Sequence, residues 1–175
     1  MSTETAIRIA AFLDANHVAS LATCGVDGPH AASVFYVRDG LALLWVSDPK
    51  SRHSAELEAD ARVAATVAPD YFEFADIRGV QILGQAHVIT DTSERAKARR
   101  MLHARYPSLQ RISEGPPGLR EAYHRVEFYR LEPRRLVLID NSRGFGHKDT
   151  LELGENSTKT TIQPILAEPI ADIQI

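Results

Sequence analysis

Residues 17–47 read "HVASLATCGVDGPHAASVFYVRDGLALLWVS" and contain three β-rich runs in close succession. Branched and aromatic residues recur in these runs, which is typical of strands. The predicted strands cover residues 17–23, 29–40 and 41–47. Each joint contains an Asp-Gly step, Asp27–Gly28 or Asp39–Gly40, which favours a tight hairpin turn. Links this short cannot make a parallel crossover, so the stretch predicts two antiparallel hairpins.

Helices are expected on both sides of these hairpins, where apolar residues recur at helical spacing or capping residues appear. The expected helices cover residues 4–16, 49–59 and 91–106. Asp48 and Pro49 form a cap and first-turn pair, and Asp91 with Glu94 has the spacing of a capping box. Pro107 is expected to end the third helix.

Four further β-rich runs complete the pattern. They predict strands over residues 61–69, 77–90, 122–133 and 134–140. Gly79 and Gly84 indicate bends in a long curved strand. Residues 108–121 are interpreted as a loop with one helical turn. The fold class is therefore mainly β (α+β), a small antiparallel barrel with flanking helices, and the lack of a GxGxxG motif argues against a dinucleotide-binding α/β fold.

The bulk composition fits one globular domain of 175 residues with 44% hydrophobic and 25% charged residues. We expect the domain to cover residues 1–153, followed by a Pro-broken tail at 154–175. A net charge of -3 does not indicate nucleic-acid binding, and no apolar run is long enough for a membrane span. The single cysteine, Cys24, excludes an intrachain disulfide and is expected to be a small buried hydrophobe. With no signal-peptide pattern, the protein is expected to be cytoplasmic.

A cationic helix start follows the third predicted strand. The strand ends and the helix begins within a short stretch that contains Ser47, Lys50, Ser51, Arg52 and His53. The helix dipole is positive at the N-terminus of a helix, so acidic rather than basic side chains are ordinarily favoured there. Hydroxyls, a guanidinium and free backbone N–H groups suit a phosphate monoester. The alternative is a solvated basic helix start in which Arg52 pairs with Glu56 four residues on.

The other chemistry-bearing residues form no recognised constellation. The seven histidines show neither HxH nor HExxH spacing, so no metal site is predicted, and no GxSxG supports a serine hydrolase. The loop "DNSRGFGHKD", residues 140–149, places Phe145 between two glycines and beside His147. A glycine pair is often only a turn, yet this loop can present an aromatic plane and a base to a ligand.

Taken together, the stretches "HVASLAT", "DGPHAASVFYVRDGLALLWVSDPKSRHSAEL", "RVAATV", "IRGVQILGQAHVI" and "EFYRLEPRRLVLID" resemble the pyridoxamine 5'-phosphate oxidase-like FMN-binding split β-barrel family. The likeness runs from about Val18 to Asp149. It implies an antiparallel split β-barrel, a homodimer, and FMN bound in clefts between the two subunits.

The resemblance also assigns cofactor-binding residues. Family members carry Ser or Thr and then Ser-Arg-Lys at the helix start, which here correspond to Ser47 and Ser51–His53. Ser51 and Arg52 would hold the FMN phosphate, while His53 stands in place of lysine and Lys50 lies close by. Ala32, Ser33 and Val34 would run along the isoalloxazine edge and read it with backbone groups. Gln81 matches a position where polar side chains face the cofactor.

The substrate is not carried over by this likeness. Pyridoxamine-phosphate oxidases have an Arg-x-His-x-Arg pattern near the C-terminus, whereas here His147 is comparable, Phe145 takes the first arginine's place and Lys148 is displaced. This departure argues against pyridoxal phosphate synthesis. The function predicted is that of an FMN-dependent oxidoreductase with Phe145 and His147 shaping its substrate pocket. The alternatives are a haem-binding split barrel with His147 or His124 as iron ligand, and a non-catalytic flavin or deazaflavin binder.

Overall fold

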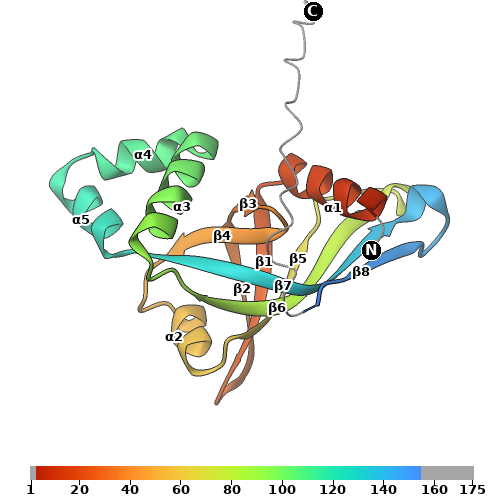
Figure 1. The fold of residues 1–175 in the computed structure, drawn as a ribbon, viewed down its shortest axis with the longest axis horizontal. Coiled ribbons are helices and arrows are strands. Elements are labelled where there is room, and N and C mark those ends of the chain that lie inside the picture. The colour runs from red at the N-terminus through yellow and green to blue at the C-terminus, as the bar shows by residue number, and fades with distance from the viewer. Residues whose placement is uncertain (1–2, 155–175) are drawn as a thin grey trace, which may run out of the picture.

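The computed structural model describes residues 3–154, which form one antiparallel sheet curled into a half-barrel (Figure 1). The strands follow the order β2-β1-β5-β6-β7-β4-β3, and β8 pairs with β7. The strands are β1 (Val18–Gly25), β2 (Gly28–Phe35), β3 (Val37–Asp39), β4 (Ala42–Ser47), β5 (Arg62–Val67), β6 (Arg78–Val88), β7 (Glu127–Asp140) and β8 (Lys148–Glu152). The split-barrel architecture expected from the sequence is confirmed.

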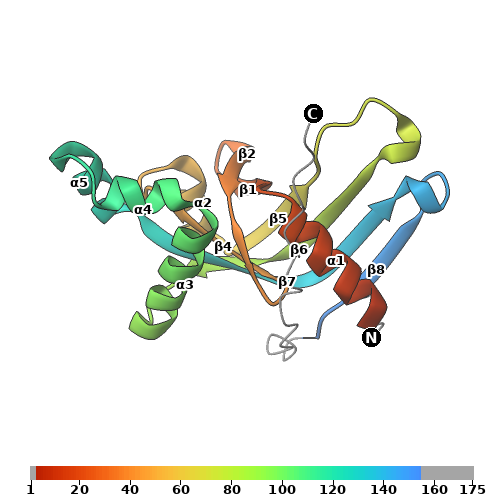
Figure 2. The same cartoon turned by 90° about the horizontal axis from the view of Figure 1, so that it is seen from above.

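Five helices flank this sheet. They are α1 (Thr3–Ala15), α2 (Arg52–Ala59), α3 (Thr92–Arg105), α4 (Pro107–Ser113) and α5 (Pro117–Arg125). Two short 3-10 turns, η1 (Phe74–Asp76) and η2 (Asn141–Arg143), lie at the ends of neighbouring strands. Figure 2 shows α1 lying across the sheet on one side, while α3, α4 and α5 project as a group at the other end of the molecule.

The main core fills the concave side of the sheet. Strand β1 alternates exposed and buried residues, so Ala19 and Leu21 point inward toward Ile9 and Leu13 of α1. Trp45 and Leu131 complete the centre of this core. Burial of apolar side chains is the main favourable contribution to folding, and the two-residue period of a strand directs one face of the sheet into that core.

Strand β4 is buried on both faces, which explains its unbroken apolar run. Leu43 and Trp45 belong to the main core, whereas Leu44 between them packs with Phe128 and Leu102 beneath α3. A strand covered on both faces shows no polar alternation. The run "LALLWV" therefore places β4 in the middle of the fold, directly before the predicted anion site.

The long strands β6 and β7 carry a β-bulge at their centre. Gly84 pairs with Pro133 and Leu83 pairs with Arg135, so Arg134 is left out of the ladder. A proline lacks the ladder N–H, and a bulge is one of the few places in a sheet where it is tolerated. The sequence-based division of residues 122–140 into two strands is therefore wrong from Glu127 onward, because one strand runs through the proline.

Other expectations about elements were also wrong, and one strand was not predicted. The run 29–40 is divided at Tyr36 into β2 and β3, helix α2 begins at Arg52 rather than Pro49, and β8 was not predicted. Residues 108–125 form α4 and α5 instead of a loop and a strand start, because Pro107 and Pro117 each occupy the first turn of a new helix. Asp91 caps α3 as expected, since its side chain accepts a hydrogen bond from the Glu94 N–H group.

The half-barrel lies within the described residues 3–154, and residues 155–175 of the expected tail lie outside the described residues. None of the helices in the described part of the chain has the length and apolar character to cross a membrane.

The bulge generates a stability prediction. A Cβ atom at Gly84 would lie 2.2 Å from the Glu132 carbonyl oxygen, so Gly84→Ala must displace the β7 backbone. We expect the free energy of unfolding to fall by about 1–3 kcal/mol, the range for overpacking a well-packed site. Gly118→Ala is the control, because nothing lies within 4 Å of its added Cβ. Equal stability of the two variants in urea denaturation would contradict the role of Gly84.

Candidate functional site

The residues of the predicted anion site lie together where β4 ends and α2 begins. The Ser47 hydroxyl lies 2.7 Å from His53 Nε2 and 3.3 Å from the Ser51 hydroxyl. Ser51 occupies the N-cap position of α2 but makes no side-chain cap hydrogen bond, because its hydroxyl donates to Ser54 at 2.8 Å. The first-turn N–H groups of a helix have no intrahelical partner. Hydroxyls, imidazole and free N–H groups thus converge at one point.

Lys50 and Arg52 lie at the exposed side of this point. The Lys50 backbone N–H group donates to Asp48 Oδ1 at 2.8 Å, which forms the turn that precedes α2. Arg52 has a half-exposed side chain, and its Nε donates to Glu56 Oε1 at 2.7 Å. The ion pair that the sequence offered as an alternative to an anion site is therefore present, with the guanidinium still accessible at its other edge.

Glu56 is the buried partner in this ion pair. Its side chain is only 9% exposed, and its second oxygen accepts a hydrogen bond from the Thr23 hydroxyl at 2.5 Å. The hydrogen bond from Thr23, followed by that from Arg52, lowers the pKa of Glu56. The carboxylate is consequently ionised at neutral pH and fixed from two sides.

His53 is buried beneath the same cluster and stacks on His30 of β2. The two ring centroids lie 6.4 Å apart with an interplanar angle of 11°. Burial, and then the like charge of His30, lower the pKa of His53, whereas Glu56 opposes this shift. The imidazole of His53 is therefore neutral at pH 7. A lysine, which the family resemblance places at this position, would be charged. Nε2 of the neutral ring can form a hydrogen bond with the hydroxyl of Ser47.

The strand beside this cluster has a free edge. Within the described residues 3–154, β2 is the terminal strand of the sheet and pairs only with β1, through a two-residue hairpin. Tyr36 N donates to the His17 carbonyl oxygen, which fixes the alternation: Ala32 and Val34 bond to β1, while the backbone groups of Ser33 face outward. Within Ala32–Val34, the residue whose N–H and C=O groups face away from β1 is therefore Ser33.

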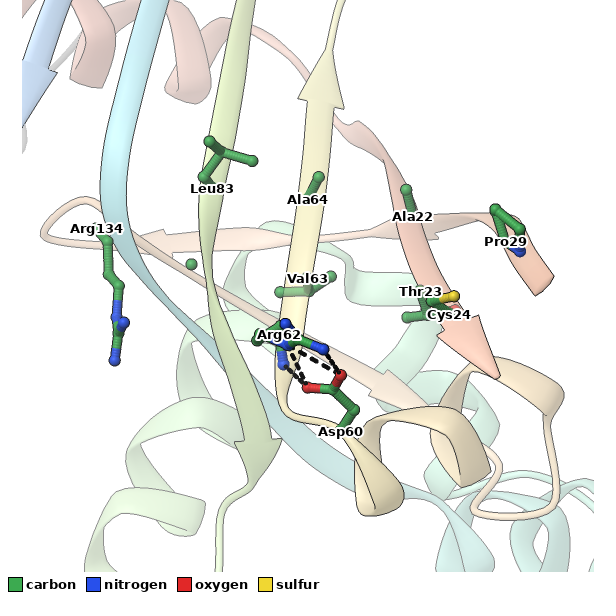
Figure 3. A pocket seen from close by; sticks show the side chains of 11 residues that line it. Ala22, Thr23, Cys24, Pro29, Asp60, Arg62, Val63, Ala64, Leu83 and Arg134 are labelled. Atoms are coloured by element: carbon green, nitrogen blue, oxygen red, sulfur yellow. Dashed lines mark hydrogen bonds and ion pairs between the residues drawn. The ribbon is translucent and has the colours of Figure 1, made fainter. Parts of the chain in front are cut away.

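Gln81 lies elsewhere, on the convex face of the sheet. It is exposed in β6 opposite Thr66 and Val137, and it lines a hollow of about 470 Å³ that reaches Ala31 of β2. A second hollow of about 490 Å³ adjoins it (Figure 3) and shares Leu83. Both hollows share Ala22, Ala64 and Leu83, so they lie side by side over β1, β5 and β6.

Cys24 opens onto the second hollow, near the ion pair of Arg62 and Asp60 (Figure 3). The expectation that this cysteine is buried is wrong, because Cys24 takes the outward position in the alternation of β1. Thr23 takes the inward position instead, where it reaches Glu56.

Phe145 and His147 lie in the loop between β7 and β8, far from α2 in one chain (Figures 1 and 2). Phe145 is 88% exposed between Gly144 and Gly146, which both have positive φ. His147 Nε2 lies 3.3 Å from Asp149 Oδ2. The same carboxylate accepts a hydrogen bond from Arg8 of α1 at 2.5 Å. The structure therefore does not bring these two residues to the predicted anion site within one chain.

A comparison with known families identifies the family of this chain. The family model described as pyridoxamine 5'-phosphate oxidase matches residues 6–141. The chain belongs to the pyridoxamine 5'-phosphate oxidase family. The matched region includes β2, α2 and Gln81, and it ends before Phe145 and His147.

The chain is also similar to curated UPF0306 proteins. A UPF0306 protein of Serratia proteamaculans is 30% identical over 149 residues, which cover 84% of this chain and 94% of that protein. A UPF0306 protein of Klebsiella pneumoniae is 29% identical over 147 residues, covering 83% of this chain and 91% of that protein.

Solved structures share the half-barrel. A heme binding protein from Mycobacterium smegmatis has a TM-score of 0.66 at 20% identity, covering 84% of this chain and 57% of that one. A FAD-binding protein from Mesorhizobium loti has a TM-score of 0.58 at 18% identity, covering 78% of this chain and 92% of that one. At these identities the likeness shows the fold.

Sequence reasoning missed two members of the site. Thr23 and His30 come from the β1–β2 hairpin and meet α2 only in the folded chain. A polar threonine at an inward position of β1 was the available signal for Thr23. No pattern in the sequence indicates that His30 stacks on His53. Among residues 3–154, no group of three or more His, Cys, Asp or Glu side chains is placed to hold a metal ion.

The buried imidazole provides a test of the electrostatics of the site. We expect the NMR titration midpoint of His53 in the free protein to lie below the ordinary histidine value of about 6.5. His30→Asn removes a like charge and should raise that midpoint, while His53→Gln identifies the resonance. Because the folded-state pKa is depressed, the contribution of His53 to stability is present above the unfolded pKa and is lost as the pH falls through the folded one. A midpoint above 6.5 would contradict the neutral imidazole.

Proposed function

We propose that the protein binds FMN through the Arg52 cluster and acts as an FMN-dependent oxidoreductase on a small acceptor. The observation that carries this proposal is the convergence of the Ser47 and Ser51 hydroxyls, the Arg52 guanidinium and the free N–H groups of α2 beside an unpaired strand edge. This donor set suits a phosphate dianion, because a guanidinium and backbone N–H groups donate hydrogen bonds and carry no acceptor atom that would repel the anion.

The residues present fit the two ends of FMN. Ser47, Ser51, Arg52 and Lys50 would hold the phosphate, and the outward backbone groups around Ser33 would meet the ring. FMN when bound supplies hydride transfer, so the chain needs to provide only binding, orientation and exclusion of water. This division of labour agrees with the lack of a general acid–base pair in the sequence.

His53 would serve the phosphate differently from a lysine. It is neutral in the free protein, and a bound dianion favours the imidazolium form. Nε2, which lies within hydrogen-bond distance of Ser47, would then donate while the hydroxyl turns toward the ligand. In this proposal the site takes up a proton as the phosphate binds.

We further propose that two copies pair through the convex face of the sheet. Exposed apolar residues lie on this face, including Val18, Phe35 and Leu83. Phe145 is too far from α2 to meet the same flavin within one chain, but the loop of a second copy can reach it. Phe145 and His147 of that copy would then shape the substrate pocket beside Gln81.

Two other roles share parts of this site. A deazaflavin also carries a phosphate, and a non-catalytic flavin carrier would use the same contacts. Anaerobic addition of NADH or NADPH distinguishes an oxidoreductase from a carrier. The flavin of an oxidoreductase is bleached and its electrons pass to an acceptor, whereas a carrier binds flavin without turnover. Mass spectrometry of the co-purifying ligand distinguishes the two flavins.

The structure favours a haem site less than a flavin site. Of the two histidines considered as iron ligands, His147 is held by Asp149, and His124 lies on α5 at the opposite end of the molecule (Figures 1 and 2). An axial ligand must face the iron from within a pocket. Neither of the two hollows on the convex face is lined by either histidine.

Binding of FMN and riboflavin by the purified protein tests the phosphate site. Arg52→Ala should weaken FMN binding roughly ten- to hundredfold, the range expected for losing hydrogen bonds to a charged group, and should leave riboflavin binding unchanged. Quenching of flavin fluorescence measures both affinities. Arg120→Ala, at an exposed arginine of α5, is the control. The assignment fails if the native protein binds FMN no more tightly than riboflavin.

The proposed dimer has its own test. Light scattering should give a mass twice the 19.3 kDa of the chain. Leu83→Glu places a charge on the convex face and should yield monomers that bind FMN weakly, because half of the cleft is lost. Leu119→Glu on α5 is a matched control, since the two leucines are 50% and 53% exposed. A monomeric native protein, or equal masses for both variants, would contradict this arrangement.

A further inference from the structure

The feature that the proposed function leaves unexplained is a buried carboxylate beside the phosphate-binding arginine. An anion site gains nothing from a nearby negative charge, because like charges repel. Yet Glu56 is buried at 9% exposure while Arg52 remains 47% exposed, and the two join at 2.7 Å. The pair is therefore rigid on the glutamate side and open on the arginine side.

The surroundings of Glu56 are shaped to fix its carboxylate. The Thr23 hydroxyl donates to Oε2 at 2.5 Å from the neighbouring strand. A Cβ atom at Gly25 would lie 2.7 Å from Oε1 and 2.9 Å from Cγ, so the end of β1 comes this close only because it carries no side chain there. His30 Nδ1 approaches Oε2 to 3.7 Å on the remaining side. Three residues of one hairpin thus enclose the group.

This enclosure determines how the guanidinium is presented. Glu56 engages the Nε–H group, and one terminal nitrogen reaches the Gly28 carbonyl oxygen at 3.5 Å. Guanidinium donors form a rigid planar fork, so fixing Nε sets the direction of the two terminal nitrogens. An exposed i,i+4 pair alone gives little order, but here one partner is already immobile.

We propose that Glu56, held by Thr23, is a positioning residue that aims Arg52 at the flavin phosphate. The inference rests on the proposed FMN site. The arginine then loses less side-chain freedom on binding, and immobilising one such side chain costs about 0.5–1.5 kcal/mol, or roughly two- to twelvefold in affinity. The gain in order exceeds the repulsion that the carboxylate exerts on the phosphate.

Three variants separate positioning from charge. Glu56→Ala removes both hydrogen bonds, and Thr23→Val removes only the support while keeping the shape of the side chain. Glu56→Gln removes the charge but keeps one acceptor, since its amide oxygen can accept from Arg52 Nε–H while its NH2 group can donate to the Thr23 hydroxyl. We expect FMN binding to weaken roughly three- to tenfold in Glu56→Ala and by a smaller factor in Thr23→Val. Glu56→Gln should bind FMN at least as tightly as the native protein.

Riboflavin provides the readout that a general structural role would not move. Because it lacks the phosphate, its affinity should be the same in all three variants and in the native protein. Equal losses of FMN and riboflavin binding would show that Glu56 only supports the fold. Tighter FMN binding by Glu56→Ala would show that the carboxylate competes for Arg52, and either result overturns the inference.

The same measurements distinguish failure of this inference from failure of the proposed function. If the native protein does not prefer FMN over riboflavin, the phosphate site itself is absent. If it does prefer FMN and Glu56→Ala retains the full preference, the site stands and the positioning role is wrong. Thermal unfolding of each variant confirms that the affinities refer to folded protein, and Thr23→Val keeps the test valid if Glu56→Ala is unstable.

Discussion

The antiparallel ladder between β6 and β7 is the constraint on which the rest of the molecule depends. β7 spans fourteen residues and pairs with β6 from Tyr129 to Asp140, with β4 along its first part and with β8 along its second part. The bulge at Gly84 bends this ladder, since an extra residue increases the local twist of a strand. One continuous strand can therefore link both halves of the half-barrel, and its bend leaves the convex face open.

The position of the site follows from this arrangement. β4 ends at Ser47 opposite Glu127 of β7, so α2 starts at the rim of the half-barrel rather than within its core. From there α2 packs against the β1–β2 hairpin, which brings Thr23 and His30 to Glu56 and His53. A charged cluster at the rim stays partly hydrated, which lowers the cost of placing an anion beside it.

The departures from the family pattern gain a physical meaning from these contacts. His53 in place of lysine exchanges a permanent charge for a group whose charge depends on its surroundings, because burial and His30 disfavour the imidazolium form. Glu56 partly neutralises Arg52, so the free site carries little net charge. Electrostatic attraction of the ligand then depends on Lys50 and the backbone N–H groups.

Periodicity and turn chemistry in the sequence determined the antiparallel fold, the main helices and the cationic cluster at Ser47–His53, because these are local properties of neighbouring residues. The elements predicted after Pro107, Pro117 and Pro133 were wrong. A proline begins a helix as readily as it ends one, and a bulge can accommodate it within a strand. Only the tertiary structure decided that Cys24 faces outward, that Thr23 and His30 join the cluster, and that the loop carrying Phe145 lies far from α2 in space. Those facts depend on contacts between segments distant in sequence, and no local pattern records which segments the bent sheet brings together.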